Sequence, residues 1–275
     1  MTSSPSGTAY SPQPTLFVPH GAPTFALRPG AAGAALAREA ATLSGLRAVI
    51  IVSPHWDTAV PTVGFAPRLE TIHDFRGFPE ELSRIRYPAT GCVRGSEEVQ
   101  AALAAAGIEA AVDPTRGLDH GAWVPLRMMY PDADVPVIPL SIQSAQGPAH
   151  HLRLGRALAP LAARGFLVIG SGNLTHNLGD YMVALRNGGQ TPGYIRSFAD
   201  WMWQHLEAGD ERALLDYRRE APSAVRAHPQ EDHLVPLFVA LGAAGERSRA
   251  LRFHAGVDDH VLAMDAFEFA AEAGQ

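Results

Sequence analysis

Three short apolar runs, each followed by a histidine, constrain this chain more than any other feature. They occur in TLFVPHG (15–21), VIIVSPHW (49–56) and FLVIGSGNLTHN (166–177), and the histidines are His20, His55 and His176. Such runs are typical of strands buried in a parallel sheet. Reactive groups in open α/β sheets collect beyond the carboxyl ends of the strands, so we expect the three imidazoles to meet in one crevice. Imidazole is the commonest protein metal ligand and the usual base at neutral pH, which predicts metal-assisted chemistry.

Strand-like and helix-like segments alternate along the rest of the chain. The predicted strands are 48–53, 60–66, 110–112, 135–141, 166–169 and 250–254, and the predicted helices are 31–43, 96–107, 123–129, 150–163, 191–207 and 231–241. Residues 73–91, rich in Gly, Pro and aromatic residues, are expected to form an ordered functional loop. The alternation predicts an α/β fold, a single-domain layered sandwich with a mostly parallel central sheet and helices on both faces.

Length and composition favour one catalytic domain over residues 14–275. The 275 residues are 47% hydrophobic and 18% charged, which suits a large buried core, and we find no repeat or dividing linker. Residues 1–13 have neither a basic start nor an apolar core, so we expect a disordered tail and no signal peptide. The apolar stretches are too short to span a bilayer, and we expect no membrane association.

Charge and residue usage exclude several classes of function. The net charge is −6 with no basic run, so nucleic acid is not an expected partner. Cys92 is the only cysteine, which excludes an internal disulfide and a thiolate metal cluster and fits a cytoplasmic location. All 22 basic residues are arginine, so no lysine is present for a Schiff base or a P-loop.

Two further histidines have settings that favour a role in the crevice. His120 lies in GLDHGAW (117–123), where it either caps a helix or enters the pocket as a proton donor or substrate anchor. His233 precedes the apolar stretch LVPLFVALG, and Glu231 and Asp232 compete with it for the same ligand position. The intermediate case is His228, and the histidines expected to be structural or exposed are His73, His150, His151, His205, His254 and His260. Adjacent helical residues point about 100° apart, so His150 and His151 cannot easily share an ion.

Six sequence blocks together resemble one known family. They are PHGAPT (19–24), VSPHW (52–56), HDFRGFPEEL with RYPATG (73–91), GLDHGAWVPLRMMYP (117–131), GSGNLTHNL (170–178) and AHPQEDHLVPLFVALGAAG (227–245). In this order, spanning nearly the whole chain, they are similar to the 4,5-DOPA extradiol dioxygenases of the LigB-type (class III) extradiol ring-cleavage superfamily.

The resemblance implies a cofactor and a role for each histidine. It implies a single non-haem Fe²⁺, with Zn²⁺ often found in recovered members, held at the positions of His20, His55 and His233. His176 matches a histidine beside the metal that serves as a base or a fourth ligand, and His120 matches a second catalytic pocket histidine. The glutamate ligand of protocatechuate-type relatives is replaced here by His233, which leaves the site without a carboxylate ligand.

The implied reaction is insertion of O₂ into a catechol such as L-DOPA, giving a ring-opened semialdehyde. Arg76, Arg84 and Arg86 could pair with a substrate carboxylate, although arginines in such positions are more often solvated. Two alternatives remain at this point, a zinc-dependent hydrolase and a Memo-like non-enzymatic binding protein. The expected partners are the small catechol and O₂, and the expected assembly is a monomer or a small homo-oligomer.

Overall fold

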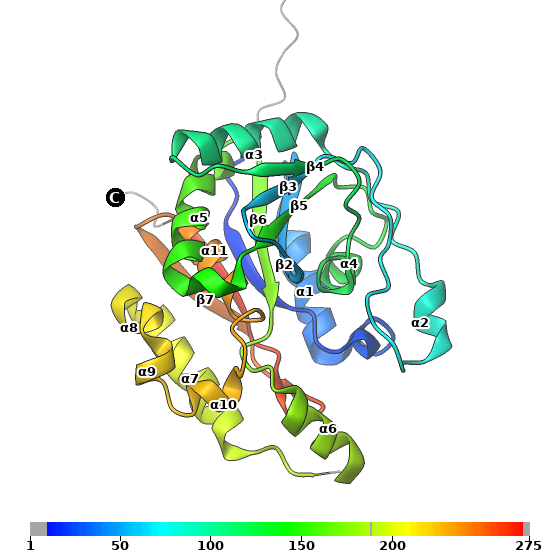
Figure 1. Cartoon of the computed structure of the whole chain (residues 1–275), viewed down its shortest axis with the longest axis vertical. Helices are drawn as coiled ribbons and strands as arrows, with labels where there is room; N and C mark the ends of the chain where they lie inside the picture. The colour runs from blue at the N-terminus through cyan, green and yellow to red at the C-terminus, as the bar shows by residue number, and fades with distance from the viewer. Residues whose placement is uncertain (1–9, 188, 272–275) are drawn as a thin grey trace, which may run out of the picture.

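The computed structural model describes residues 10–187 and 189–271, coloured along the chain in Figure 1. The strands in this part are β1 (Thr15–Pro19), β2 (Ala48–Asp57), β3 (Thr62–Gly64), β4 (Ala111–Asp113), β5 (Val137–Ile142), β6 (Phe166–Gly172), β7 (Ser248–His254), β8 (Val257–Asp258), β9 (Leu262–Ala263) and β10 (Ala266–Ala271). The α-helices are α1 (Gly30–Thr42), α2 (Glu80–Arg84), α3 (Val93–Ala105), α4 (His120–Met129), α5 (Gly147–Ala162), α6 (Leu178–Asn187), α7 (Gly193–Ala208), α8 (Glu211–Leu215), α9 (Tyr217–Glu220), α10 (Ala224–Ala227) and α11 (Val235–Ala243). Short 3₁₀ turns cover Pro23–Ala26 and Ser144–Gln146.

A large mixed sheet forms the centre of the molecule. Among the described residues it has eight strands in the order β4-β3-β5-β2-β6-β1-β10-β7. The four central strands β5, β2, β6 and β1 are mutually parallel, whereas β3 pairs with β5 and β10 pairs with β1 and β7 in antiparallel fashion. The predicted α/β fold with a mostly parallel core is therefore confirmed, and its edges are antiparallel.

Helices cover both faces of the sheet because the central strands are apolar on both sides. Along β2, Ile50 and Val52 pack in one cluster with residues of α3, α5 and α11. Val49 and Ile51 belong to a second cluster with residues of α1 and α4. Successive side chains of a strand point to opposite faces, so a continuous apolar run supplies two cores at once.

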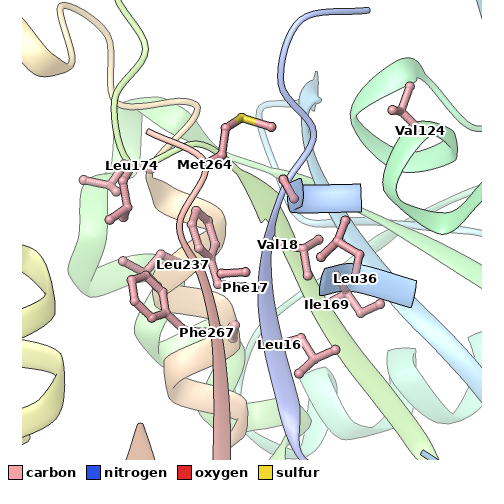
Figure 2. Close-up of a cluster of buried hydrophobic side chains, with 14 of the residues drawn as sticks. Leu16, Phe17, Val18, Leu36, Val124, Ile169, Leu174, Leu237, Met264 and Phe267 are labelled. Atoms are coloured by element: carbon pink, nitrogen blue, oxygen red, sulfur yellow. The ribbon is translucent and has the colours of Figure 1, made fainter. Parts of the chain in front are cut away.

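The same alternation is visible in β1. Figure 2 shows Leu16 and Val18 on the side of Leu36 from α1, whereas Phe17 lies on the side of Leu237 from α11 and Phe267 from β10. All six of these side chains are fully buried. Burial of one such side chain stabilises a fold by roughly 1.5–3 kcal/mol, so this layer fixes β1 firmly in the sheet.

The carboxyl ends of β2, β6 and β1 lie side by side, which brings the three strand-following histidines to one edge. β2 is irregular there: Val52 pairs with Leu140 and Asp57 with Ile142, so residues 53–56 of β2 face the single Ser141 of β5. Such an insertion bends a strand and redirects its side chains. His55 lies in the inserted segment.

Several predicted bounds differ from the structure. The extended run 60–66 is a strand only over Thr62–Gly64, and the last helix begins at Val235 and not at 231. Pro236 in its first turn is a usual helix-start residue, and residues 231–234 form a turn before it. The predicted loop 73–91 contains α2, and α4 begins at His120 because the Asp119 side chain accepts a hydrogen bond from Ala122 N.

The two ends of the predicted domain are only partly described. Residues 1–9 of the expected tail and residues 272–275 lie outside the described part. Gln13, the last residue of the expected tail, is buried; its backbone N–H donates to Ala162 O and its side chain donates to Ser44 O. The packed chain thus begins before Pro14. None of the helices in the described ranges is long and apolar enough to cross a membrane.

Candidate metal and catalytic site

Five histidines line one cavity at the carboxyl edge of the central strands. The cavity has a volume of about 610 Å³, and His20, His55, His120, His176 and His233 all contribute to its wall. The first two and His176 come from the strand ends, His120 from the first turn of α4, and His233 from the turn before α11. The crevice expected from the sequence therefore exists and includes both additional histidines.

His20 is held in one tautomer by a chain of hydrogen bonds. Ser171 Oγ lies 2.5 Å from Gly121 O, an atom that can only accept, so the serine hydroxyl donates there. Its oxygen then accepts from His20 Nδ1, which is 3.1 Å away. A proton on Nδ1 leaves the lone pair of His20 on Nε2.

His55 faces two groups through its two ring nitrogens. Its Nδ1 lies 3.5 Å from Asp74 Oδ2, and its Nε2 lies 3.3 Å from His20 Nε2. Behind it, Ser53 Oγ donates to Asp119 Oδ1 at 2.5 Å and accepts from the backbone N–H of His55 at 3.3 Å. The contact with Asp74 is electrostatic and lacks hydrogen-bond alignment, and it favours a proton on Nδ1 of His55. In that tautomer the Nε2 lone pair of His55 faces the Nε2 lone pair of His20.

His233 is presented by a close contact between β6 and the turn before α11. Asn173 N donates to His233 O at 3.1 Å, and a Cβ on Gly172 would lie 2.2 Å from that same oxygen, so only glycine permits this approach. His233 Nδ1 lies 3.1 Å from Asp232 Oδ2, an electrostatic contact without hydrogen-bond alignment. Glu231, the other competing ligand, accepts a hydrogen bond from Tyr217 instead.

The donor set of His20, His55 and His233 fits a metal ion. One ring nitrogen from each lies within 4.8 Å of the others. Burial, aided by repulsion from the neighbouring histidines, lowers the pKa of His20 and of His233 well below the ordinary value. Burial also lowers the pKa of His55 to about 4, so the imidazoles are neutral and carry lone pairs at neutral pH. Neutral imidazoles suit zinc, copper and iron alike.

His176 and His120 lie beside this donor set. The ring of His176 stacks on that of His233 with centroids 3.4 Å apart and an interplanar angle of 4°. Within the described residues, His176 does not belong to the converging ligand group. His120 is 4.0 Å from His55 between ring centroids, and its Nδ1 donates to Asp74 Oδ1 at 2.9 Å. The arrangement favours proton transfer over ligation for both.

Several supporting residues were not selected from the sequence. Asp119 caps α4 and also accepts from Arg116 at 2.7 Å, while the Arg116 guanidinium stacks on Trp56 at 5.1 Å. Asp74 contacts both His55 and His120. Hydrogen bonds from His120 outweigh the opposing effect of burial and lower the pKa of Asp74 to about 2, so it is an anion. Its place between His73 and Phe75, in the segment expected to form a functional loop, was the only signal in the sequence.

The arginines considered as substrate anchors lie elsewhere. Arg84 pairs with Glu80 on the surface of α2, and Arg86 donates to the carbonyls of Ser83 and Ile85. The cavity wall, as far as the structure describes it, contains Asn177, Gln230 and two aspartates but no arginine.

The chain is similar to characterised dioxygenases along most of its length. Residues 28–266 match the family described as the catalytic LigB subunit of aromatic ring-opening dioxygenase. A 4,5-DOPA dioxygenase extradiol from Beta vulgaris is 38% identical over 259 residues, covering 93% of this chain and 96% of that protein. The Escherichia coli K12 protein of the same name is 33% identical over 235 residues, covering 84% of each.

A solved structure has the same architecture. It is a crystal structure of an uncharacterized protein from Escherichia coli K12, with a TM-score of 0.76 and 28% sequence identity. The alignment covers 93% of this chain and 99% of that one. The two chains therefore share their fold over nearly their whole length.

Proposed function

Because the chain belongs to the family of the catalytic LigB subunit of aromatic ring-opening dioxygenases and is an extradiol dioxygenase, we propose that it uses Fe²⁺ to cleave catechols such as L-DOPA. Both atoms of O₂ would enter the product, a ring-opened semialdehyde. The observation that carries this proposal is the convergence of His20, His55 and His233 through ring nitrogens whose partners leave lone pairs at a common point.

The three histidines would hold the metal, and enzymes of this family depend on a metal. Ferrous iron there would supply chelation of the two catechol oxygens and electron transfer between the ring and dioxygen, which zinc, having no redox change, does not supply. His20 and His233 are buried, so their rings are held by the surrounding protein. The protein also holds the three rings from three different elements, which fixes their spacing before a metal binds.

His176 and His120 would move the protons of the catechol. Burial lowers the pKa of His176 to about 4, so its imidazole is neutral and can accept a phenolic proton. His120 donates its Nδ1 proton to Asp74, which leaves Nε2 as an acceptor in the resting enzyme. Either residue, once protonated, can return a proton when the ring opens.

The cavity wall suits an aromatic ring with a short tail. Phe75 and Phe78, whose rings are 5.7 Å apart, line it together with Pro23 and Leu262. A volume of about 610 Å³ is in the range of pockets that enclose small organic ligands. These apolar groups would pack on the ring and exclude water from it.

Oxygen uptake with defined metals tests the proposal. Protein stripped of metal and reloaded with Fe²⁺ should consume one O₂ per catechol, and ¹⁸O₂ should label the product with both atoms. The zinc-loaded protein should consume none. Equal turnover with zinc, or turnover without O₂, would instead support the zinc hydrolase. Binding of catechol without any turnover in every metal form would support a Memo-like role.

A further inference from the structure

Asp74 lies between the two kinds of histidine in the cavity. Its Oδ1 is 2.9 Å from His120 Nδ1, and its Oδ2 is 3.5 Å from His55 Nδ1. The first histidine belongs to the proposed proton-transfer pair and the second to the proposed metal ligands. The Asp74 carboxylate therefore contacts one histidine of each kind. Its side chain is 23% exposed.

The segment that carries Asp74 is fixed against the start of α4. Ile72 N donates to Leu118 O at 2.8 Å, and Trp123 Nε1 donates to Ile72 O at 3.1 Å. The edge of the Phe75 ring meets His120 with centroids 5.6 Å apart. These contacts hold the backbone on either side of Asp74 against the start of α4.

The contacts of Asp74 are those of a hydrogen-bond acceptor and not of a ligand to a second metal. His55, Asp74 and His120 do bring potential ligand atoms within 4.8 Å of one another. However, Oδ1 also accepts from the backbone N–H of His120 at 3.0 Å, and a backbone amide N–H does not bind a cation. His120 therefore donates two hydrogen bonds to Asp74 Oδ1, one from its backbone N–H and one from Nδ1. The second of these bonds fixes the ring proton of His120 on Nδ1.

We propose that Asp74 is a shared positioning residue that favours the same tautomer in both rings, with the proton on Nδ1 and the lone pair on Nε2. It acts on His120 through hydrogen bonds and on His55 through a 3.5 Å electrostatic contact. The inference rests on the proposed function for the roles of the two rings. Histidine ligands commonly donate their second nitrogen to a carboxylate, which orients the ring and raises its basicity. Here the same carboxylate also orients the proton acceptor, so metal affinity and proton transfer depend on one side chain.

The decisive variant is Asp74→Ala, measured first in zinc-loaded protein. Its zinc affinity, from competition with a chelator, should fall about 10- to 100-fold. In ¹⁵N NMR spectra, the His120 ring should shift from the Nδ1–H tautomer of the wild type toward Nε2–H. Neither readout needs catalysis, so each can succeed even if the iron-dependent reaction is wrong. With saturating Fe²⁺, kcat should fall by about 10² or more while KM changes little.

Three other variants keep the test sharp. Asp74→Asn keeps the shape but offers one acceptor oxygen for two rings, so zinc affinity or kcat should fall even if the alanine variant does not fold. The Asp232 carboxylate contacts His233, so Asp232→Asn should lower zinc affinity and leave the His120 NMR signal unchanged. Glu81→Ala, on the exposed face of α2, is the matched control and should change nothing.

Two results would overturn the proposal. One is an unchanged His120 tautomer with unchanged zinc affinity in Asp74→Ala. The other is binding of two zinc ions per wild-type chain with one lost in that variant, which would make Asp74 a ligand to a second metal.

Discussion

Two pairs of histidines lie near the carboxyl ends of neighbouring strands, and only one pair has the properties of a metal site. His150 and His151 follow β5, and their ring centroids are 5.1 Å apart. His20 follows β1 and His55 lies in the irregular end of β2, with ring centroids 5.2 Å apart. Burial lowers the pKa of His151 to about 4, as it does for His55. The ring spacing and the lowered pKa of the buried histidines therefore do not separate the two pairs.

The hydrogen-bond partners separate them. His151 Nε2 accepts from Gln143 N at 3.1 Å, its Nδ1 donates to Gly147 O at 2.7 Å, and His150 Nε2 donates to Gln143 Oε1 at 2.9 Å. In the cavity, by contrast, the Nε2 atoms of His20 and His55 face each other at 3.3 Å with their protons on the far nitrogens. Two lone pairs at that distance repel each other unless a cation lies between them, which distinguishes a binding site from a structural pair.

The largest effect is expected from removing one imidazole of the donor set formed by His20, His55 and His233. His20→Ala should abolish stoichiometric zinc or iron binding and activity while the far-UV circular dichroism spectrum stays unchanged. The variant leaves only two of the three imidazoles that converge on the ion, so the ion loses a ligand. Metal analysis after dialysis measures the effect, with His150→Ala as the matched control that should keep full metal content. Full occupancy in His20→Ala would remove His20 from the ligand set and weaken the comparison.

The next effect concerns the histidines beside the donor set. His176→Ala should keep most of the metal and lose about 10²- to 10⁴-fold in kcat, since a neutral base is removed from the cavity. His120→Ala should behave alike and also bind catechol more weakly. Iron titration into each variant, followed by turnover at saturating metal, separates the roles. A parallel loss of iron affinity in His176→Ala would make it a fourth ligand.

A smaller effect is expected in the structural pair and depends on pH. His151→Ala removes the acceptor of Gln143 N, and an unsatisfied buried N–H costs about 1–3 kcal/mol at pH 7. The folded-state pKa of His151 is lowered, so the wild type loses stability as pH falls below 6.5 toward 4 because the unfolded chain gains a proton first. The variant lacks that loss.

The difference in free energy of unfolding between wild type and His151→Ala should therefore shrink by about 2 kcal/mol from pH 7 to pH 4.5. Urea denaturation of metal-free protein at both pH values measures it. Zinc affinity at pH 7 should match that of the wild type. A pH-independent difference would show that His151 titrates normally, and a loss of zinc binding would break the distinction between the two pairs.

The sequence predicts where the strands end better than it predicts which side chains meet in the cavity. The apolar runs before His20, His55 and His176 are long enough to indicate buried parallel strands, and parallel strands share a carboxyl edge. Asp74 gave no comparable signal, because its partner His120 is 46 residues away and its other partner is placed by an irregularity in β2. The strand β10 was missed although Phe267 and Phe269 alternate with Glu268, a period-2 pattern.

The smallest effect is expected at the arginines that once suggested a substrate anchor. Arg84, with 71% of its side chain exposed, pairs with Glu80 one helical turn away, and such surface pairs contribute about 0.3–0.5 kcal/mol. The double variant Arg84→Ala/Arg86→Ala should therefore change the free energy of unfolding by less than about 1 kcal/mol and leave KM for L-DOPA within about twofold of the wild type. Unsubstituted catechol, which has no carboxylate, is the matched substrate for the KM comparison. A tenfold rise in KM for L-DOPA alone would contradict this expectation. It would mean that the 73–91 segment closes over the substrate and brings one of these arginines into the cavity wall.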